Sequence, residues 1–276
     1  METPTESPTL MRGRVLICAG SDSGGGAGIQ ADLKTVTALG GFAMTAITAL
    51  TAQNTMGVFA ISDVPLDFVA QQIQVVLEDI GADSVKTGML HSEGVIRMVR
   101  HVLDEYSHEL PLVVDPVMVA KGGHRLLDPG ALEMLKSVII PRAQLVTPNI
   151  PEAELLTNTT IETVEDMAQA AERLLLLGPN AVLIKGGHMK GFEVTDFLVA
   201  PGILETFTDE KIETRHTHGT GCTMASAIAT GIAQGLDIET AVKRARTYVR
   251  TAILTAPEHG QGHGPLNHAH TMRPNM

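Results

Sequence analysis

The sequence predicts a three-layer α/β sandwich with a mostly parallel central sheet. Short apolar segments alternate with amphipathic segments along most of the chain. Parallel strands need crossover helices, and those helices cover both faces of the sheet. The 276 residues are 44% hydrophobic and 18% charged, which excludes wholesale disorder. Since we find no linker and no repeat, we expect one domain over residues 13–268, a flexible N-terminal tail over 1–12 and a C-terminal tail over 269–276.

The first quarter of the chain predicts a strand, a helix, further strands and a second helix. The apolar run RVLICA over 14–19 is typical of a central strand, and residues 29–39 predict a helix. Residues 42–62 are rich in Thr and Ala and contain no charge, so we expect strands there, partly outside the main sheet. Residues 65–80 place apolar side chains on one stripe, which predicts an amphipathic helix.

The middle of the chain continues this alternation. Short buried strands of a parallel sheet are expected at 84–87, 112–115, 144–147 and 181–185. Helices are expected near 93–105, 130–138, 151–157 and 164–177. A meander of strands should follow around 193–215, and the last long helix should cover 238–253.

The segment from Glu258 onward is rich in Gly and His and lacks helical periodicity. We expect it to be mostly flexible. The alternative is a metal site made by its four histidines, His259, His263, His268 and His270.

Charge and cysteine content restrict the partners. Lys and Arg total 20 against 31 Asp and Glu, a net charge of -11, so we expect binding to neither nucleic acid nor anionic membrane. No apolar run is long enough to cross a bilayer, and the first dozen residues lack the order of a secretory signal. The only cysteines, Cys18 and Cys222, make a disulfide scaffold or a structural zinc site improbable and favour the cytoplasm.

A first Gly-rich loop, residues 19–28, joins the first strand to a helix. Gly26-x-Gly28-x-x-Ala31 matches a dinucleotide fingerprint, which also needs an acidic residue about 20 positions later. No Asp or Glu occurs between Leu33 and Ser62, which argues against an oxidoreductase. No Lys-Ser or Lys-Thr follows the glycines, which excludes a Walker loop.

A second Gly-rich element, HGTGCT over 218–223, precedes an apolar helix that continues through Gly235. Its free backbone N–H groups and the helix dipole predict an anion site; the alternative is an ordinary turn with Thr220 as helix cap. Cys222 lies in the first turn, where a thiolate is favoured, so we expect its pKa to lie below that of a free thiol. The alternative is a small buried residue, as we interpret Cys18.

Three smaller signals lie between these loops. Asn149 and Glu152 could bring an amide and a carboxylate to hydrated magnesium, although their spacing alone favours a helix capping box. Lys185 ends a predicted strand and suits either a phosphate oxygen or a solvated edge. Asp115 ends another strand, where it faces a metal or caps a turn.

These segments in this order resemble the ribokinase-like superfamily, and within it the hydroxymethylpyrimidine/phosphomethylpyrimidine kinases of thiamine biosynthesis. The resemblance covers nearly the whole chain, and sugar kinases of the superfamily usually carry Asp where this sequence has Cys222. The matching stretches are AGSDSGGGAGIQADLKT (19–35), TALTAQNT (48–55), VKTGML (85–90), VVDPVMVAKGG (113–123), TPNIPEAELL (147–156), IKGGH (184–188), HTHGTGCTMASAIA (216–229) and GHGPLNH (262–268).

The resemblance implies a ribokinase-like fold with a small β lid and a homodimer. It implies an enzyme that uses ATP and Mg²⁺ to phosphorylate 4-amino-5-hydroxymethyl-2-methylpyrimidine and then its monophosphate. The nearest alternative is a pyridoxal or pyridoxine kinase of the same fold. An alternative of another class is a catalytically silent vitamin-sensing domain.

The resemblance also implies roles for individual residues. The transferring phosphoryl group is held by a backbone anion hole made by Gly219, Thr220, Gly221 and Cys222. From the proton that an alcohol loses on phosphorylation, we add the hypothesis that Cys222 is also the base in the alcohol step. ATP is bound by Lys185, Asn149, Thr220 and Gly221, and Mg²⁺ by Asp115 and Glu152 through water. The substrate is bound by Gly20, Asp22, Ala27, Met44, Gln53, Met89 and Val117. Within that set Gln53 recognises the aminopyrimidine, Met89 and Val117 enclose its ring, and Met44 belongs to a lid over 42–55, where the dimer contact is also expected.

Overall fold

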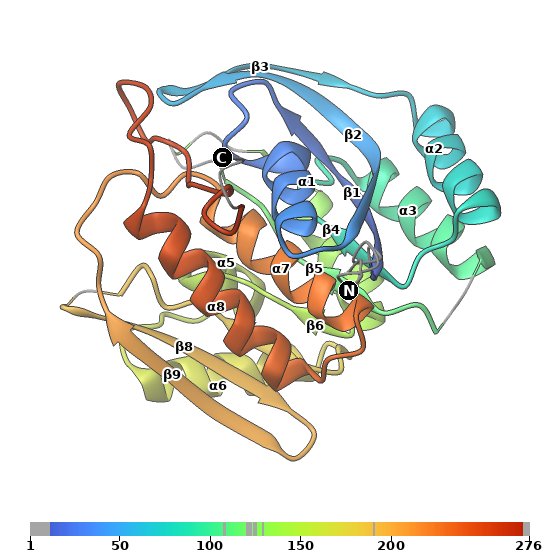
Figure 1. Cartoon of the computed structure of the whole chain (residues 1–276). Helices are drawn as coiled ribbons and strands as arrows, with labels where there is room; N and C mark the ends of the chain where they lie inside the picture. The colour runs from blue at the N-terminus through green and yellow to red at the C-terminus, as the bar shows by residue number, and fades with distance from the viewer. Residues whose placement is uncertain are drawn as a thin grey trace, which may run out of the picture.

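A nine-stranded sheet organises the residues that the computed structural model describes, which are 12–106, 109–119, 123, 126–128, 130–189 and 191–272. Its strand order is β3-β2-β1-β4-β5-β6-β7-β8-β9 (Figure 1). The strands from β2 to β7 in this order run parallel, and antiparallel strands complete both edges. The prediction of a mostly parallel central sheet is therefore confirmed.

The strand boundaries follow the apolar runs. The parallel strands are β1 (Arg14–Asp22), β2 (Phe42–Asn54), β4 (Ser84–Thr87), β5 (Leu112–Val114), β6 (Leu145–Val146) and β7 (Val182–Ile184). The antiparallel strands are β3 (Gly57–Asp63), β8 (Glu193–Ala200) and β9 (Ile203–Glu210). The segment 42–62 lies within the main sheet, contrary to expectation, because β2 pairs with β1 from its first residue. The second half of β2 and β3 form an antiparallel ribbon at the sheet edge.

Helices cover both faces of the sheet, which completes the three predicted layers (Figure 1). One face carries α1 (Gly28–Ala38), α7 (Thr220–Ala233) and α8 (Ile238–Leu254). The other carries α2 (Leu66–Asp79), α3 (Glu93–Tyr106), α4 (Ala131–Met134), the turns η1 (Leu135–Ile139) and η2 (Ile140–Arg142), α5 (Ile150–Thr157) and α6 (Val164–Leu175). Strand β1 alternates between them: Leu16 and Cys18 join one core cluster, and Val15 and Ile17 the other.

The C-terminal segment packs against the domain with Leu266 and His268 buried, contrary to the expectation of a mostly flexible segment from Glu258 onward. His268 is buried, and its Nε2 lies 2.9 Å from Oγ1 of Thr223 at the start of α7. The segment has no periodicity because loop contacts, rather than a helix face, hold it. Residues 1–11 and 273–276, within the two predicted tails, lie outside the described residues.

The histidines of this segment do not assemble a metal site. His263 and His270 each place a ring nitrogen 3.1 Å from a backbone carbonyl oxygen, that of Arg215 and Tyr248 respectively. In the described part of the chain, no group of three or more His, Cys, Asp or Glu residues is placed to hold a metal ion. Nor is any described helix both long and apolar enough to span a membrane.

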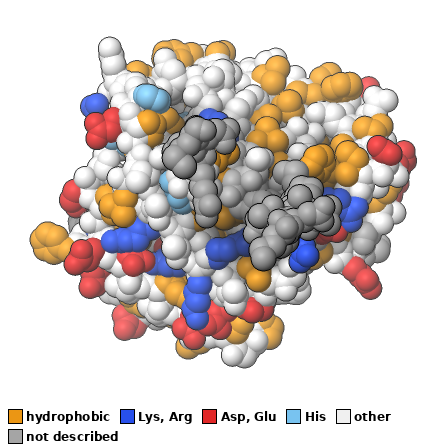
Figure 2. All heavy atoms as spheres, viewed as in Figure 1, with side chains coloured by type: hydrophobic (Ala, Val, Ile, Leu, Met, Phe, Trp, Pro, Cys, Tyr) orange, Lys and Arg blue, Asp and Glu red, His pale blue; other side chains and the backbone are white. Residues whose placement is uncertain are grey.

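Apolar side chains gather on the outer surface of β2, β3 and α2. Phe59 is 70% exposed, Met56 61% and Phe68 55%. Figure 2 shows hydrophobic side chains concentrated at the upper right, where Figure 1 places these elements.

Candidate active site

Two cavities open at the carboxyl ends of the parallel strands and meet there. The first, of about 400 Å³, extends from the loop after β1 to the start of α7, and we name it the β1 cavity. The second, of about 440 Å³, lies between β9, its following loop and α8, and we name it the β8–β9 cavity. Both cavities are lined by Asn149, Lys185, His188, Thr217, Thr220 and Gly221. A ligand in each could therefore reach the other at the start of α7.

The start of α7 is built from backbone. Its cap residue Gly219 has a φ of 85°, and a Cβ there would lie 1.9 Å from the carbonyl oxygen of Gly26, so only glycine fits. No side chain of the described residues caps the helix. The alternative with Thr220 as cap is wrong, because Thr220 is the first helical residue and its hydroxyl donates to the Thr217 carbonyl oxygen at 3.2 Å. The backbone N–H groups of the first turn and the helix dipole give the start of α7 a positive potential that suits an anion, as the predicted anion site requires.

Lys185 adds a positive charge to this anion site. A Cβ on Gly221 would lie 3.2 Å from its Nζ, which places the ammonium group against the first turn of α7. Lys185 is also paired with Asp115, at 2.8 Å between Nζ and Oδ1. The solvated-edge alternative for Lys185 is wrong, since its side chain is 13% exposed.

Two carboxylates beside Lys185 fit a divalent cation. Asp115 is buried, and its Oδ2 has no hydrogen-bond partner among the described residues. Burial raises the pKa of Glu152 to about 7; Lys185 opposes the rise and the nearby Asp115 adds to it. A hydrated cation would favour both ionised carboxylates and give the unpartnered oxygen a partner.

Asn149 and Glu152 also form the capping box of α5. The Asn149 side chain accepts from the Glu152 N–H at 2.9 Å, and Glu152 accepts from the Asn149 N–H at 2.8 Å. The capping interpretation favoured by their spacing is therefore confirmed. The capping role does not exclude the predicted magnesium role, since Asn149 and Glu152 also line the β1 cavity.

Cys222 is a thiol rather than a thiolate at neutral pH. Burial raises its pKa to about 12, a rise that Lys86 opposes and Asp32 reinforces. The expectation of a lowered pKa is therefore wrong, because burial outweighs the favourable start of the helix. Cys18 is the buried core residue expected, with its pKa likewise raised by burial to about 12.

All but one of the residues predicted to contact the substrate line the β1 cavity together with Cys222. They are Gly20, Asp22, Ala27, Gln53, Met89 and Val117. Met44 is the exception and its predicted site role is wrong. It pairs with Leu16 early in β2 and is buried in the core against the helices of the α2–α3 face. The strand alternation points it into the sheet packing, far along β2 from the cavity.

A β-bulge positions Gln53. The register between β2 and β3 shifts between Ala52 and Gln53, and bulges re-aim the side chain that follows. Ser23 holds this backbone: its hydroxyl donates to the Gln53 carbonyl oxygen and accepts from the Gln53 N–H, both at 2.8 Å. The β2–β3 ribbon packs beside Met89 and Val117, in the position expected of a lid.

Sequence reasoning missed a buried ion pair at the floor of the β1 cavity. Lys86 on β4 and Asp32 on α1 are both fully buried, 2.9 Å apart between Nζ and Oδ2. The Ser226 hydroxyl donates to Asp32 at 2.7 Å. A lysine inside a four-residue buried strand was the available signal, because buried lysines are rare unless paired.

Sequence reasoning also missed the role of His218, which joins the two Gly-rich loops. Nε2 of His218 lies 2.9 Å from Oδ2 of Asp22, across 196 positions of the sequence. His218 stands at the start of the second Gly-rich motif, but nothing local to it indicates its partner. The contact lies next to Gln53, whose Nε2 is 3.3 Å from His218 Nε2.

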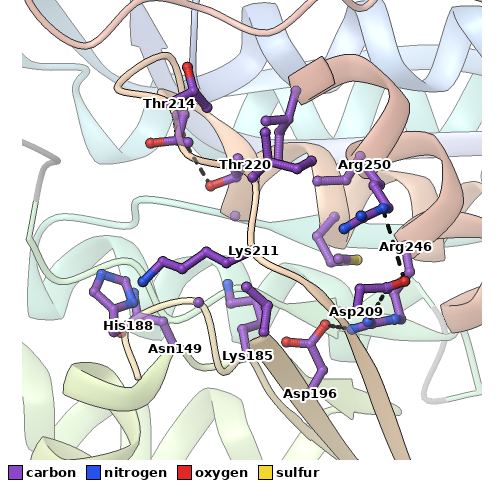
Figure 3. A pocket seen from close by; sticks show the side chains of 18 of the residues that line it. Asn149, Lys185, His188, Asp196, Asp209, Lys211, Thr214, Thr220, Arg246 and Arg250 are labelled. Atoms are coloured by element: carbon purple, nitrogen blue, oxygen red, sulfur yellow. Dashed lines mark hydrogen bonds and ion pairs between the residues drawn. The ribbon is translucent and has the colours of Figure 1, made fainter. Parts of the chain in front are cut away.

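The β8–β9 cavity has an excess of positive side chains on an acidic chain. The cations that line it are Lys185, Lys211, Arg215, Arg246 and Arg250, against the three acidic residues Asp196, Asp209 and Glu210. Figure 3 shows Lys185, Lys211 and Arg250 around one space, with Arg246 held by Asp196 and Asp209. Asp196 also accepts from the Gly186 N–H at 2.8 Å, so the same network holds the loop after Lys185. Positive charge gathered in a concave site attracts anionic ligands locally.

Sequence comparison places the chain in a known family. A family model described as phosphomethylpyrimidine kinase matches residues 22–267. The chain is 46% identical over 256 residues to the hydroxymethylpyrimidine/phosphomethylpyrimidine kinase of Bacillus subtilis, covering 92% of this chain and 94% of that protein. It is 53% identical over 257 residues to the thiamine biosynthesis bifunctional protein ThiED of Geobacter sulfurreducens, covering 93% of this chain and only 52% of that longer protein.

Solved structures agree with the family. The phosphomethylpyrimidine kinase of Clostridium difficile 630 is 45% identical with a TM-score of 0.78, over 87% of this chain and 99% of that one. The pyridoxal kinase of Staphylococcus aureus in complex with pyridoxal is 33% identical with a TM-score of 0.87, over 95% and 96% of the two chains. The protein is thus a phosphotransferase with a ribokinase-like fold, and it belongs to the phosphomethylpyrimidine kinase family.

Proposed function

We propose that the protein transfers the γ-phosphoryl group of ATP to the hydroxymethyl group of 4-amino-5-hydroxymethyl-2-methylpyrimidine, and then phosphorylates the resulting monophosphate. One observation carries this proposal. Gln53 and Cys222 line one cavity, and that cavity meets a cationic cavity at Lys185 and the first turn of α7. A ring bound at Gln53 would present its substituent to a phosphoryl group held at α7. The names of the relatives support the same substrates.

The β1 cavity suits a small aminopyrimidine. The Gln53 amide offers one acceptor and one donor side by side, which matches an exocyclic amine next to a ring nitrogen. Met89 and Val117 supply apolar surface for the ring, and Gly20 and Ala27 let backbone approach it. These side chains are aliphatic or thioether, as expected in a chain with 3% aromatic residues.

The β8–β9 cavity suits ATP, with its phosphates directed to the start of α7. Lys185 and the N–H groups in the first turn of α7 would hold the transferring phosphoryl group, those of Gly221 and Cys222 foremost, because the Thr220 N–H already donates to the Thr217 carbonyl oxygen at 3.4 Å. Each well-placed donor of this kind contributes about 10²–10³ in rate, because it stabilises charge that develops in the transition state.

Asp115 and Glu152 would hold Mg²⁺ through water. The unpartnered Oδ2 of Asp115 and the raised pKa of Glu152 support this assignment. When bound, the cation would neutralise phosphate charge. Without it, Lys185 is the group that balances both carboxylates.

The two acceptors differ in their proton count. The alcohol loses a proton as it is phosphorylated, whereas a phosphate monoester has a second pKa near ~6 and is already mostly dianionic at neutral pH. With its pKa raised to about 12, Cys222 can serve as base in the first step only if substrate binding releases its proton. In the second step we assign it a backbone role in the anion hole.

The direct test incubates purified protein with ATP, Mg²⁺ and the hydroxymethylpyrimidine, and separates monophosphate from diphosphate. We expect both products in sequence, each with stoichiometric ADP. Absence of ATP consumption would instead support a silent vitamin-binding domain and contradict the proposal.

Pyridoxal phosphorylation is the second candidate, and the fold match to the Staphylococcus aureus pyridoxal kinase favours testing it. Pyridoxal carries a phenol and needs a larger pocket. We expect a higher kcat/KM for the aminopyrimidine when both are assayed in parallel. A higher kcat/KM for pyridoxal than for the aminopyrimidine would identify pyridoxal as the preferred substrate.

We further propose a homodimer through the apolar outer surface of β2, β3 and α2. Its support is the exposure of Met56, Phe59 and Phe68 on one face. Light scattering should give a mass twice that of the 29.3 kDa monomer. The Phe59→Asp variant should give the mass of a single monomer. A monomeric wild-type protein would contradict this proposal.

A further inference from the structure

Asp22 at the end of β1 is held as a carboxylate. Its oxygens accept from the backbone N–H groups of Gly24 and Ala27, each at 2.8 Å, and of Gly26 at 3.1 Å. Burial alone would raise its pKa, but the hydrogen bonds from His218 and from this backbone leave the pKa below its ordinary value. An ionised carboxylate only accepts hydrogen bonds.

His218 must therefore donate through Nε2. That atom lies 2.9 Å from Oδ2 of Asp22, and a carboxylate oxygen at this distance requires a proton on the nitrogen. The requirement is the same for the neutral Nε2–H tautomer and for the charged ring. Nε2 of His218 therefore has no free lone pair to accept from Gln53, and its single N–H, directed at Asp22, can at most be shared with an acceptor atom of Gln53 at 3.3 Å.

Thr51 must act as an acceptor toward the same glutamine. Its hydroxyl lies 2.9 Å from the carbonyl oxygen of Ser21, which can only accept, so the single hydroxyl proton points there. The Gln53 amide also contacts this hydroxyl oxygen, at 3.2 Å. Whatever atom of Gln53 faces Thr51 should therefore donate.

These two neighbours determine which way the Gln53 amide faces. As placed, Nε2 lies 3.3 Å from His218 Nε2 and Oε1 lies 3.2 Å from Thr51, so donor meets donor and acceptor meets acceptor. After a half-turn of the amide, Nε2 donates to Thr51, and Oε1 shares the His218 N–H with Asp22 in a three-centre hydrogen bond. Each amide atom then retains one unused position, a lone pair on Oε1 and a hydrogen on Nε2.

We propose that His218, anchored by Asp22, is a positioning residue that holds the Gln53 amide in this one orientation and so selects the ring. The site then accepts an exocyclic donor beside a ring acceptor, as in a 4-aminopyrimidine. It rejects the 4-oxo counterpart, whose exocyclic oxygen and N3–H present the reverse order. This inference rests on the proposed function, because it specifies the ring that the β1 cavity takes.

The first test compares kcat/KM for 4-amino-5-hydroxymethyl-2-methylpyrimidine and for its 4-oxo counterpart. The wild-type protein should prefer the amino ring by about 10³, since the wrong ring leaves polar groups unpaired. His218→Leu frees the amide to turn and should lower this preference by about tenfold or more. His218→Gln restores an N–H donor and should recover much of it. His101→Leu is the matched control, because the His101 side chain is 71% exposed on α3.

The ratio of kcat/KM for the amino ring to that for the oxo ring distinguishes a positioning role of His218 from a purely structural one. A structural role alone would lower kcat/KM for both rings equally in His218→Leu and leave their ratio unchanged, which would overturn the proposal. If the wild-type protein phosphorylates neither pyrimidine, the proposed function fails instead.

A second measurement uses the unmodified protein and so does not depend on whether a variant folds. Nuclear Overhauser contacts of the Gln53 side-chain amide protons should be stronger to Thr51 than to the His218 ring. Stronger contacts to the His218 ring than to Thr51 would show the opposite amide orientation and overturn the proposal, whatever the variants do.

Discussion

Two lysines of the same sheet, Lys86 within β4 and Lys185 just after β7, form ion pairs that differ in how completely their carboxylates are hydrogen-bonded. Lys86 and Asp32 are both fully buried, and Asp32 receives a further hydrogen bond from Ser226. Lys185 is 13% exposed, and its partner Asp115 keeps a carboxylate oxygen without a partner among the described residues. We call the Lys86–Asp32 pair closed, because both side chains are buried and satisfied by each other and by Ser226. We call the Lys185–Asp115 pair open, because Asp115 Oδ2 can still accept a ligand. A satisfied buried pair stabilises one arrangement of the core, whereas an incompletely satisfied one at a cavity is suited to a charged ligand.

Breaking the closed pair should have the largest effect on stability. Lys86→Met leaves Asp32 as an unpaired buried carboxylate, which costs about 3–5 kcal/mol. Urea unfolding followed by circular dichroism measures this loss. The double variant Lys86→Met/Asp32→Leu should recover most of it. If Lys86→Met were as stable as wild type, the Lys86–Asp32 ion pair would not stabilise the protein in solution, and the prediction would fail.

Breaking the open pair should instead affect activity. Lys185→Met removes a donor from the transferring phosphoryl group, so kcat/KM should fall about 10²–10³. The free energy of unfolding should change by much less than in Lys86→Met. Lys243→Met on the exposed face of α8 is the control and should match wild type in both assays. Equal stability losses for Lys86→Met and Lys185→Met would remove the distinction between the pairs.

Cys222 is influenced by both pairs, since Lys86, Asp32 and Asp115 all act on its pKa. If it takes the alcohol proton, Cys222→Ala should slow the first phosphorylation about 10² more than the second. Measuring both rates in one preparation tests this difference, with Cys222→Ser as the control of similar size. Equal losses in the two steps would assign Cys222 to packing and backbone alone.

The smallest effect concerns Glu152 at the open pair. Its folded-state pKa of about 7 exceeds the ordinary 4.5, so its protonated form contributes stability below pH 4.5 that is lost as the pH rises through 7. Relative to Glu152→Gln, wild type should lose about 2–3 kcal/mol between pH 5 and pH 8. Urea unfolding at both pH values measures this, and Mg²⁺ at pH 8 should reverse part of it. A pH-independent difference would contradict the raised pKa.

Local patterns predicted most of the secondary structure and part of the site. The alternation of short strands and helices, the capping box at Asn149 and the glycines before α7 act over a few residues, and each lies where the sequence predicts it. The site residues that follow strand ends converge because parallel strands end at one edge.

Contacts between distant segments could not be predicted in this way. Lys86 meets Asp32 across 54 positions, and His218 meets Asp22 across 196. The same reason explains Met44, whose strand was predicted but whose burial depends on the helices that cover it. It also explains Cys222, because burial by surrounding elements outweighs the local helix terminus in its pKa.

The sequence by itself thus determined the order of elements, the glycine-built anion site and the kinase family. Only the tertiary structure decided which charges are paired, which thiol is protonated and which way a recognition amide faces. The physical reason is range: propensity, capping and backbone conformation act between neighbours in the chain, whereas burial and hydrogen-bond partnership depend on the strand order that brings remote segments together.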